Sequence, residues 1–111
     1  MIKGINNTEE EIIKKILAEY PYKFYFYGSR VKGGFTRGSD LDILILADRE
    51  LPAGELERLD TEFNKSKIPY RVNFSQRITM DENFYKLIEN SLVEVDKWFI
   101  FSMEKKILIL I

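Results

Sequence analysis

The chain contains no cysteine and no histidine. The absence of cysteine excludes disulfide bonds and thiolate metal sites, and the absence of histidine removes imidazole as a metal ligand and as a general base. Any metal ion that this chain binds must therefore be a hard cation held by oxygen atoms, which suits Mg²⁺ or Mn²⁺.

Excess charge of one sign and long hydrophobic runs are also missing. The 17 basic and 18 acidic residues nearly cancel, so the chain lacks the basic field that nucleic-acid binding requires. No apolar run approaches the ~18 residues of a membrane span, and the first residues include Lys3 and Glu9 rather than the apolar core of a secretion signal. We therefore expect a cytoplasmic protein that contacts neither nucleic acid nor membrane directly.

The length of 111 residues suits a single domain spanning 1–111. Such a domain is small for an enzyme that must hold a nucleotide and a second substrate, so we expect a protein partner or an oligomer. The segment 98–111 contains two apolar tracts, 98–101 and 107–111. Either these tracts form a last core segment or they form a docking surface for a partner, and the sequence leaves both interpretations open.

An amphipathic helix is predicted near the beginning of the chain. Thr8 and Glu11 have the spacing of a capping box, and Pro21 is expected to end the helix. The predicted apolar face consists of Ile12, Ile13, Ile16, Leu17 and Tyr20.

Strands and helices alternate in the rest of the chain. Residues 23–27, 41–47 and 68–74 predict strands, and the second is apolar at consecutive positions, as in a strand covered on both faces. Residues 53–65 predict a helix, and Asp81 is expected to cap a further helix that carries Phe84, Tyr85, Leu87 and Ile88. This order predicts an α/β (α+β) domain, with a small mixed β-sheet flanked by helices.

The most informative motif is Gly28-Ser29, followed after ten residues by Asp40-Leu41-Asp42. Carboxylates at positions i and i+2 of an extended segment point to the same side, so both could bind one divalent cation. A Gly-Ser pair at the end of a strand, opening a short helix, places N–H groups and a hydroxyl where a phosphate could bind. A glycine-rich loop with a Ser-Asp turn is the alternative, but it gives no reason for a carboxylate at Asp42, where an apolar strand begins.

Residues 28–42 resemble the signature of the DNA polymerase β-type nucleotidyltransferases, and the short chain resembles their minimal members, the antitoxin partners of HEPN-domain toxins. The resemblance implies a polymerase β-like palm in which Gly28 and Ser29 bind nucleotide phosphates and Asp40 and Asp42 bind metal ions. Further candidate nucleotide-binding residues in the same loop are Arg30, Lys32, Arg37 and Ser39, although basic residues in such a loop can also be plain surface charges.

Asn73 stands at the position where the resemblance leads us to expect a third catalytic carboxylate. An amide oxygen can coordinate a hard cation, but it is uncharged and cannot accept a proton at neutral pH. Metal and nucleotide binding could therefore persist while transfer is impaired. A natural loss of activity and an introduced Asp→Asn change both fit this departure, and so does an asparagine that only ends a strand.

The resemblance implies an antitoxin of a HEPN toxin–antitoxin system that transfers AMP from ATP, with Mg²⁺ or Mn²⁺, to a tyrosine of the ribonuclease toxin in a hetero-oligomer. Polymer-making and antibiotic-modifying relatives need additional domains, for which this chain has no room. A second hypothesis is a catalytically inactive binding module of the same fold that neutralises the toxin by complex formation. A stand-alone nucleotidyltransferase acting on small molecules is less well supported, because no acceptor pocket is recognisable in the sequence.

Overall fold

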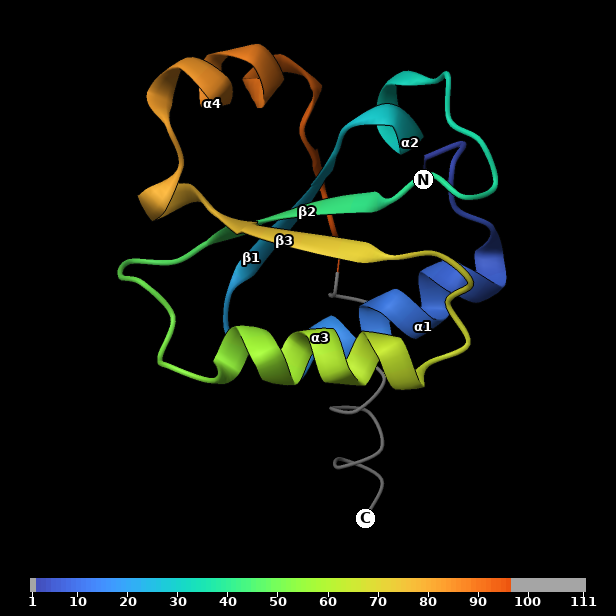
Figure 1. Cartoon of the computed structure of the whole chain (residues 1–111), viewed down its shortest axis with the longest axis horizontal. Coiled ribbons are helices and arrows are strands. Elements are labelled where there is room, and N and C mark those ends of the chain that lie inside the picture. Colours follow the sequence, from blue (N-terminus) through green and yellow to red (C-terminus); the bar gives the residue numbers. More distant parts are fainter. Residues whose placement is uncertain (1, 97–111) are drawn as a thin grey trace, which may run out of the picture.

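The computed structural model describes residues 2–96 and contains a four-stranded sheet with the strand order β3-β2-β1-β4. Strand β1 is antiparallel to both β2 and β4, whereas β2 and β3 are parallel. Helices α1 and α3 lie below this sheet in Figure 1, and α4 lies above it. The elements in chain order are α1 (Asn7–Leu17), β1 (Lys23–Tyr27), α2 (Ser29–Lys32), β2 (Leu41–Leu46), α3 (Glu55–Lys65), β3 (Val72–Gln76), the 3₁₀ turn η1 (Arg77–Thr79), α4 (Glu82–Ile88), η2 (Glu89–Ser91) and β4 (Val93–Glu94). The predicted small mixed sheet flanked by helices is confirmed.

The first helix begins earlier than predicted. Its N-cap is Asn6, whose Oδ1 accepts from the Glu9 N–H at 2.8 Å, while Glu9 Oε1 accepts from the Asn6 N–H at 3.1 Å. The prediction of a capping box at Thr8 and Glu11 is therefore wrong. The sequence offers the same spacing in more than one frame, and Tyr70, which donates to Glu9 Oε1 at 3.1 Å, adds a distant contact that local patterns do not reveal.

The third strand lies later than the predicted range 68–74. Pro69 has no N–H to donate to a sheet, and the pairing with β2 begins only where Leu41 lies opposite Val72. The strand then continues to Gln76, so Asn73 falls near its beginning.

The core forms on both faces of β2, as the sequence predicts. Leu41, Ile43 and Ile45 are buried against the side of the sheet that α1 and α3 cover, whereas Leu44 packs with Tyr27 and Ile88 on the side of α4. The alternation along the strand therefore places Asp42 on the same face as Leu44.

Helix α4 begins at the predicted cap. Asp81 Oδ1 accepts from the N–H groups of Asn83 and Phe84 at 2.7 and 3.1 Å. Ile88 is buried, but Phe84 and Leu87 are 43% and 73% exposed. The apolar segment 98–111 lies outside the described residues, and within residues 2–96 no helix is long and apolar enough to cross a membrane.

Candidate functional site

Gly28 forms the link between the end of β1 and the beginning of α2. Its φ of 85° lies in the left-handed region, which favours glycine, and a Cβ atom at this position would collide with Asp42 Oδ2. Its carbonyl accepts from the N–H groups of Val31 and Lys32 at 3.1 and 3.0 Å, which starts the short helix. Glycine is therefore required here both by the backbone angle and by the close approach of a carboxylate.

Three polar side chains from two neighbouring strands meet beside this turn. Asp42 lies opposite Tyr27 in the antiparallel pair and opposite Asn73 in the parallel pair. The Asn73 Nδ2 group donates to Asp40 Oδ2 at 2.8 Å and to Asp42 Oδ1 at 3.4 Å. Asp40 precedes the first residue of β2, yet its carboxylate accepts from the same Asn73 amide as the Asp42 carboxylate. The structure thus brings Asp40, Asp42 and Asn73 together.

Within residues 2–96, no ion pair joins the Asp42 carboxylate to a basic side chain. Burial raises the pKa of its carboxyl, donation from Asn73 opposes that rise, and the charge of Asp40 adds to it, so the pKa lies above its usual value. A bound cation would reverse this tendency by stabilising the charged form. In the same part of the chain, no group of three or more acidic, histidine or cysteine side chains is placed to hold a metal ion. The site at Asp40 and Asp42 is not such a group, because its third side chain, Asn73, is an amide.

The donor set nevertheless fits a hard cation. Two carboxylates and one amide oxygen are the ligand types that Mg²⁺ and Mn²⁺ accept. The Asn73 nitrogen occupies the point on which both carboxylates converge, and rotation of the amide would present its oxygen there instead.

Arg30 does not lie where the sequence led us to expect it. Its side chain is buried, with 4% of the residue exposed, and it donates to the carbonyls of Gly4, Ser39, Arg37 and Thr36 at 2.6, 2.9, 3.0 and 3.4 Å. Because these donors are engaged by the main chain, we correct the expectation that Arg30 binds nucleotide.

The other loop residues differ in their surroundings. Lys32 and Arg37 are exposed and available to a ligand. The hydroxyl of Ser39 instead accepts from the Thr36 N–H at 2.8 Å, so it stabilises the turn before Asp40. Ser29, the first residue of α2, is partly exposed beside Gly28.

Sequence reasoning missed two hydroxyls on the same face of the sheet. The Tyr27 and Ser75 hydroxyl oxygens lie 3.2 Å apart, and Ser75 follows Asn73 by two strand positions. Burial raises the pKa of Tyr27, the bond with Ser75 lowers it, and the nearby Asp42 charge raises it. The period of two along β3 was the signal that could have identified Ser75.

Comparison with known proteins shows the family. The model of the family described as "Nucleotidyltransferase domain" matches residues 9–109. The "Probable protein adenylyltransferase MntA" of Haemophilus influenzae is 33% identical over 95 residues, which cover 84% of this chain and 83% of that protein.

Two crystal structures of toxin–antitoxin complexes share the fold. One is of MntA–HpeT in a mutant form, with a TM-score of 0.65, 18% identity and coverage of 88% of both chains. The other contains AMP-PNP and has a TM-score of 0.66, 19% identity and the same coverage of 88% of both chains. The chain therefore belongs to the nucleotidyltransferase domain family and, within it, to the minimal DNA polymerase β-type members that resemble MntA.

Proposed function

We propose that this chain is an antitoxin that transfers AMP from ATP to a tyrosine of a HEPN-domain ribonuclease toxin. The observation that carries the proposal is the convergence of Asp40 and Asp42 on Asn73, beside the turn at Gly28. The 33% identity to a probable protein adenylyltransferase supports the reaction class. The toxin–antitoxin complexes among the structural neighbours support a protein partner.

In this proposal, different residues of the chain bind the metal ion and the phosphates of ATP. Asp40 and Asp42 hold Mg²⁺ or Mn²⁺, and Asn73 offers its amide oxygen as a further neutral ligand. The Ser29 hydroxyl and the adjoining N–H groups bind phosphate, and the exposed cation of Lys32 or Arg37 adds charge to the triphosphate. A bound divalent cation supplies charge neutralisation along the triphosphate and so favours displacement at phosphorus.

In the transfer step, the tyrosine hydroxyl oxygen of the toxin bonds to the α-phosphorus of ATP. The bond from that phosphorus to the oxygen leading to the β-phosphate breaks, and pyrophosphate leaves with the electron pair. The phenolic proton must also depart. The Asn73 amide cannot accept it, so the proton passes to water, and transfer is slower than it would be with a carboxylate at this position.

The same asparagine favours a second candidate function, a binding module that neutralises the toxin by complex formation. In this alternative, ATP and metal still bind, because Gly28, Asp40 and Asp42 are retained. The toxin is then inhibited because it is covered and not because it is modified.

Mass spectrometry of a HEPN toxin co-expressed with this chain separates the two functions. Addition of one or more AMP units to a toxin tyrosine supports the enzyme, provided that the Asp40→Asn, Asp42→Asn double variant adds none. An unmodified, inactive toxin in a stable complex contradicts the enzyme and supports the binding module.

The Asn73→Asp variant sharpens this test. A carboxylate at position 73 restores a proton acceptor, and general-base assistance is typically worth ~10²–10⁴ in rate, so AMP transfer should rise by a factor of that order. The measurement is transfer from labelled ATP to purified toxin at matched Mg²⁺ for both versions. Equal rates would show that position 73 is not the missing catalytic position.

A further inference from the structure

Arg30 is a buried cation for which the proposed chemistry has no use. It is the one charged residue that is buried within residues 2–96, and no ion pair joins it to a carboxylate in that part of the chain. Burying an unpaired charge is costly, so a specific set of contacts must offset the loss of water. Besides the carbonyls, these contacts are the ring of Tyr70, 3.7 Å from the guanidinium carbon, and the ring of Phe35 at 5.5 Å.

The carbonyls that accept from Arg30 belong mainly to the loop that leads to the metal-site carboxylates. Residues 33–40 contain no helix or strand, and most of them are exposed. The Arg30 side chain bonds to three carbonyls of this loop, and the last, that of Ser39, immediately precedes Asp40. The guanidinium therefore restrains the segment from which the Asp40 carboxylate projects.

Arg30 also connects this loop to a segment that is distant from it in the sequence. Its Nη1 donates to the Gly4 carbonyl at 2.6 Å, and the Gly4 N–H donates back to the Arg30 carbonyl at 3.2 Å. A Cβ at Gly4 would lie 2.7 Å from that same carbonyl oxygen, so the two segments are in close contact. The loop is thus anchored to the segment that precedes α1.

Tyr70 extends this anchor toward β3. Its ring stacks on the guanidinium, and its hydroxyl donates at 3.1 Å to Glu9 Oε1, which also accepts from the N–H of Asn6, the N-cap of α1. Tyr70 precedes Asn73 by three residues. The stack therefore connects the segment that carries Asp40 with the segment that carries Asn73, the two sides of the candidate metal site.

We propose that Arg30 is a positioning residue that fixes Asp40 relative to Asp42 and Asn73. This inference rests on the proposed metal site. The planar guanidinium fork reaches several carbonyls at once while its face stacks on an aromatic ring, whereas a lysine supplies a single point charge. A loop that contains Gly33, Gly34 and Gly38 is entropically costly to order, and these bonds hold Asp40 in place before the metal binds.

The test compares Arg30→Lys and Tyr70→Leu with the control Arg58→Lys. Arg58 also lies over a tyrosine ring, that of Tyr20 at 5.3 Å, but it is exposed on α3, which covers the opposite face of the sheet from α4 (Figure 1). Calorimetry with Mn²⁺ measures metal affinity, and amide hydrogen exchange measures the order of residues 33–40. Residues behind metal ligands typically affect affinity by 10–100-fold, so both test variants should raise the Mn²⁺ Kd by roughly that factor.

The expected result also includes faster exchange confined to residues 33–40, with the rest of the chain and the Arg58→Lys control unchanged. A folded Arg30→Lys variant with parental Kd and parental exchange overturns the proposal. If the Arg30→Lys variant does not fold, the Tyr70→Leu variant decides the question. Faster exchange along the whole chain in both variants, rather than in residues 33–40 alone, overturns the proposal in favour of a purely structural role. If the parent binds no Mn²⁺, the proposed metal site fails, and the exchange data alone decide whether Arg30 positions the loop.

Discussion

At the scale of single residues, Gly28 shows how a backbone requirement and a functional one coincide. Its positive φ and its contact with the Asp42 carboxylate both exclude a side chain. We predict that Gly28→Ala lowers the free energy of unfolding by about 1–3 kcal/mol and also abolishes Mn²⁺ binding, because the added methyl group displaces Asp42. Chemical denaturation and calorimetry measure the two effects.

Gly34→Ala is the matched control for this prediction. Gly34 has a φ of 79°, but a Cβ there would meet nothing within 4 Å. Both variants should therefore carry the cost of the backbone angle, and only Gly28→Ala should lose the metal. Equal Mn²⁺ affinities in the two variants would contradict the close approach of Gly28 to a metal ligand.

The aspartate pair gives a second prediction at this scale. Replacing Asp40 and Asp42 together by Asn removes both charges while keeping the side-chain shapes, so metal-dependent ATP binding should disappear while the fold persists. Calorimetry with ATP in the presence and absence of Mg²⁺ measures the loss, and Asp48→Asn, an exposed aspartate beyond the end of β2, serves as the control. Unchanged ATP affinity in the double variant would refute the metal role of the pair.

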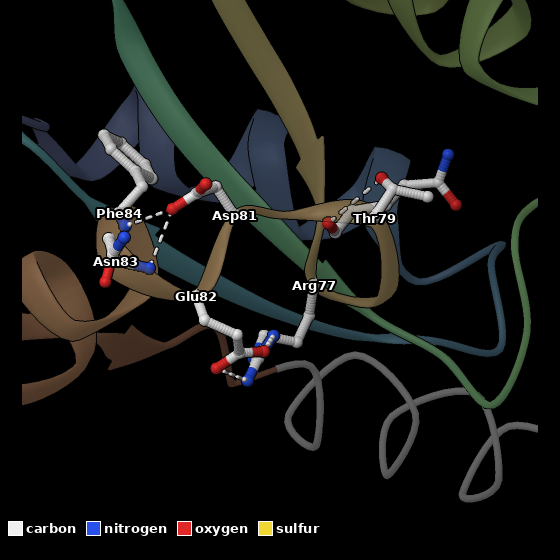
Figure 2. A network of polar contacts seen from close by, with 7 residues as sticks. Arg77, Thr79, Asp81, Glu82, Asn83 and Phe84 are labelled. Atoms are coloured by element: carbon white, nitrogen blue, oxygen red, sulfur yellow. Dashed lines mark hydrogen bonds and ion pairs between the residues drawn. The ribbon is translucent and has the colours of Figure 1, made fainter.

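At the scale of elements, the junction between β3 and α4 is held by a local polar network (Figure 2). Asp81 caps α4, and Arg77 bonds to both carboxylate oxygens of Glu82 at 2.9 and 3.2 Å. The Arg77 guanidinium also lies 3.7 Å from the centre of the Tyr85 ring. This network sets the direction in which α4 leaves β3 and returns over the sheet to bury Leu44.

We predict that Asp81→Ala lowers the free energy of unfolding by about 1 kcal/mol, within the usual range for an N-cap. The variant leaves two N–H groups of the first turn without their side-chain acceptor. Urea denaturation followed by circular dichroism measures the change. Glu82→Gln should have a smaller effect, because Glu82 lies on the surface, where ion pairs contribute little. A larger loss in Glu82→Gln would mean that the ion pair, rather than the cap, holds the helix.

The accuracy of the sequence predictions differs among elements for physical reasons. Strand β1 has the predicted bounds because Pro21 and Gly28 limit it locally. The start of α1 was misplaced because several Asx or Thr residues precede glutamates at capping distance, and the choice of Glu9 involves Tyr70, far away in sequence. The burial of Arg30 could not be predicted either, since its acceptors come from a loop and from Gly4. Local signals therefore predicted the elements and the motif, whereas long-range contacts decided the caps and the loop.

At the scale of the whole molecule, the candidate site exists only because of the order of the strands. Gly28 ends β1, Asp42 lies in β2, and Asn73 lies in β3, and the sheet order places β2 between the other two. The parallel pairing of β2 and β3 requires a crossover, which α3 provides on the opposite face of the sheet from α4 (Figure 1). Because no single segment contains the site, metal binding and folding must be thermodynamically linked.

This linkage gives a prediction for Asn73→Asp that does not depend on activity. Without metal, the Asn73 amide donates to both carboxylates, and an aspartate there would replace two hydrogen bonds with repulsion among three like charges. The variant should therefore unfold at a lower temperature than the parent in EDTA. Since a third carboxylate tightens the site, Mg²⁺ should then stabilise the variant more than it stabilises the parent. Free Mg²⁺ at about 100 times the variant's Kd would stabilise the variant by about 2.7 kcal/mol relative to EDTA, and the parent, with its higher Kd, by less. Thermal unfolding of both proteins with EDTA and with Mg²⁺ measures the difference. An equal Mg²⁺ shift in both would show that position 73 does not belong to the metal site.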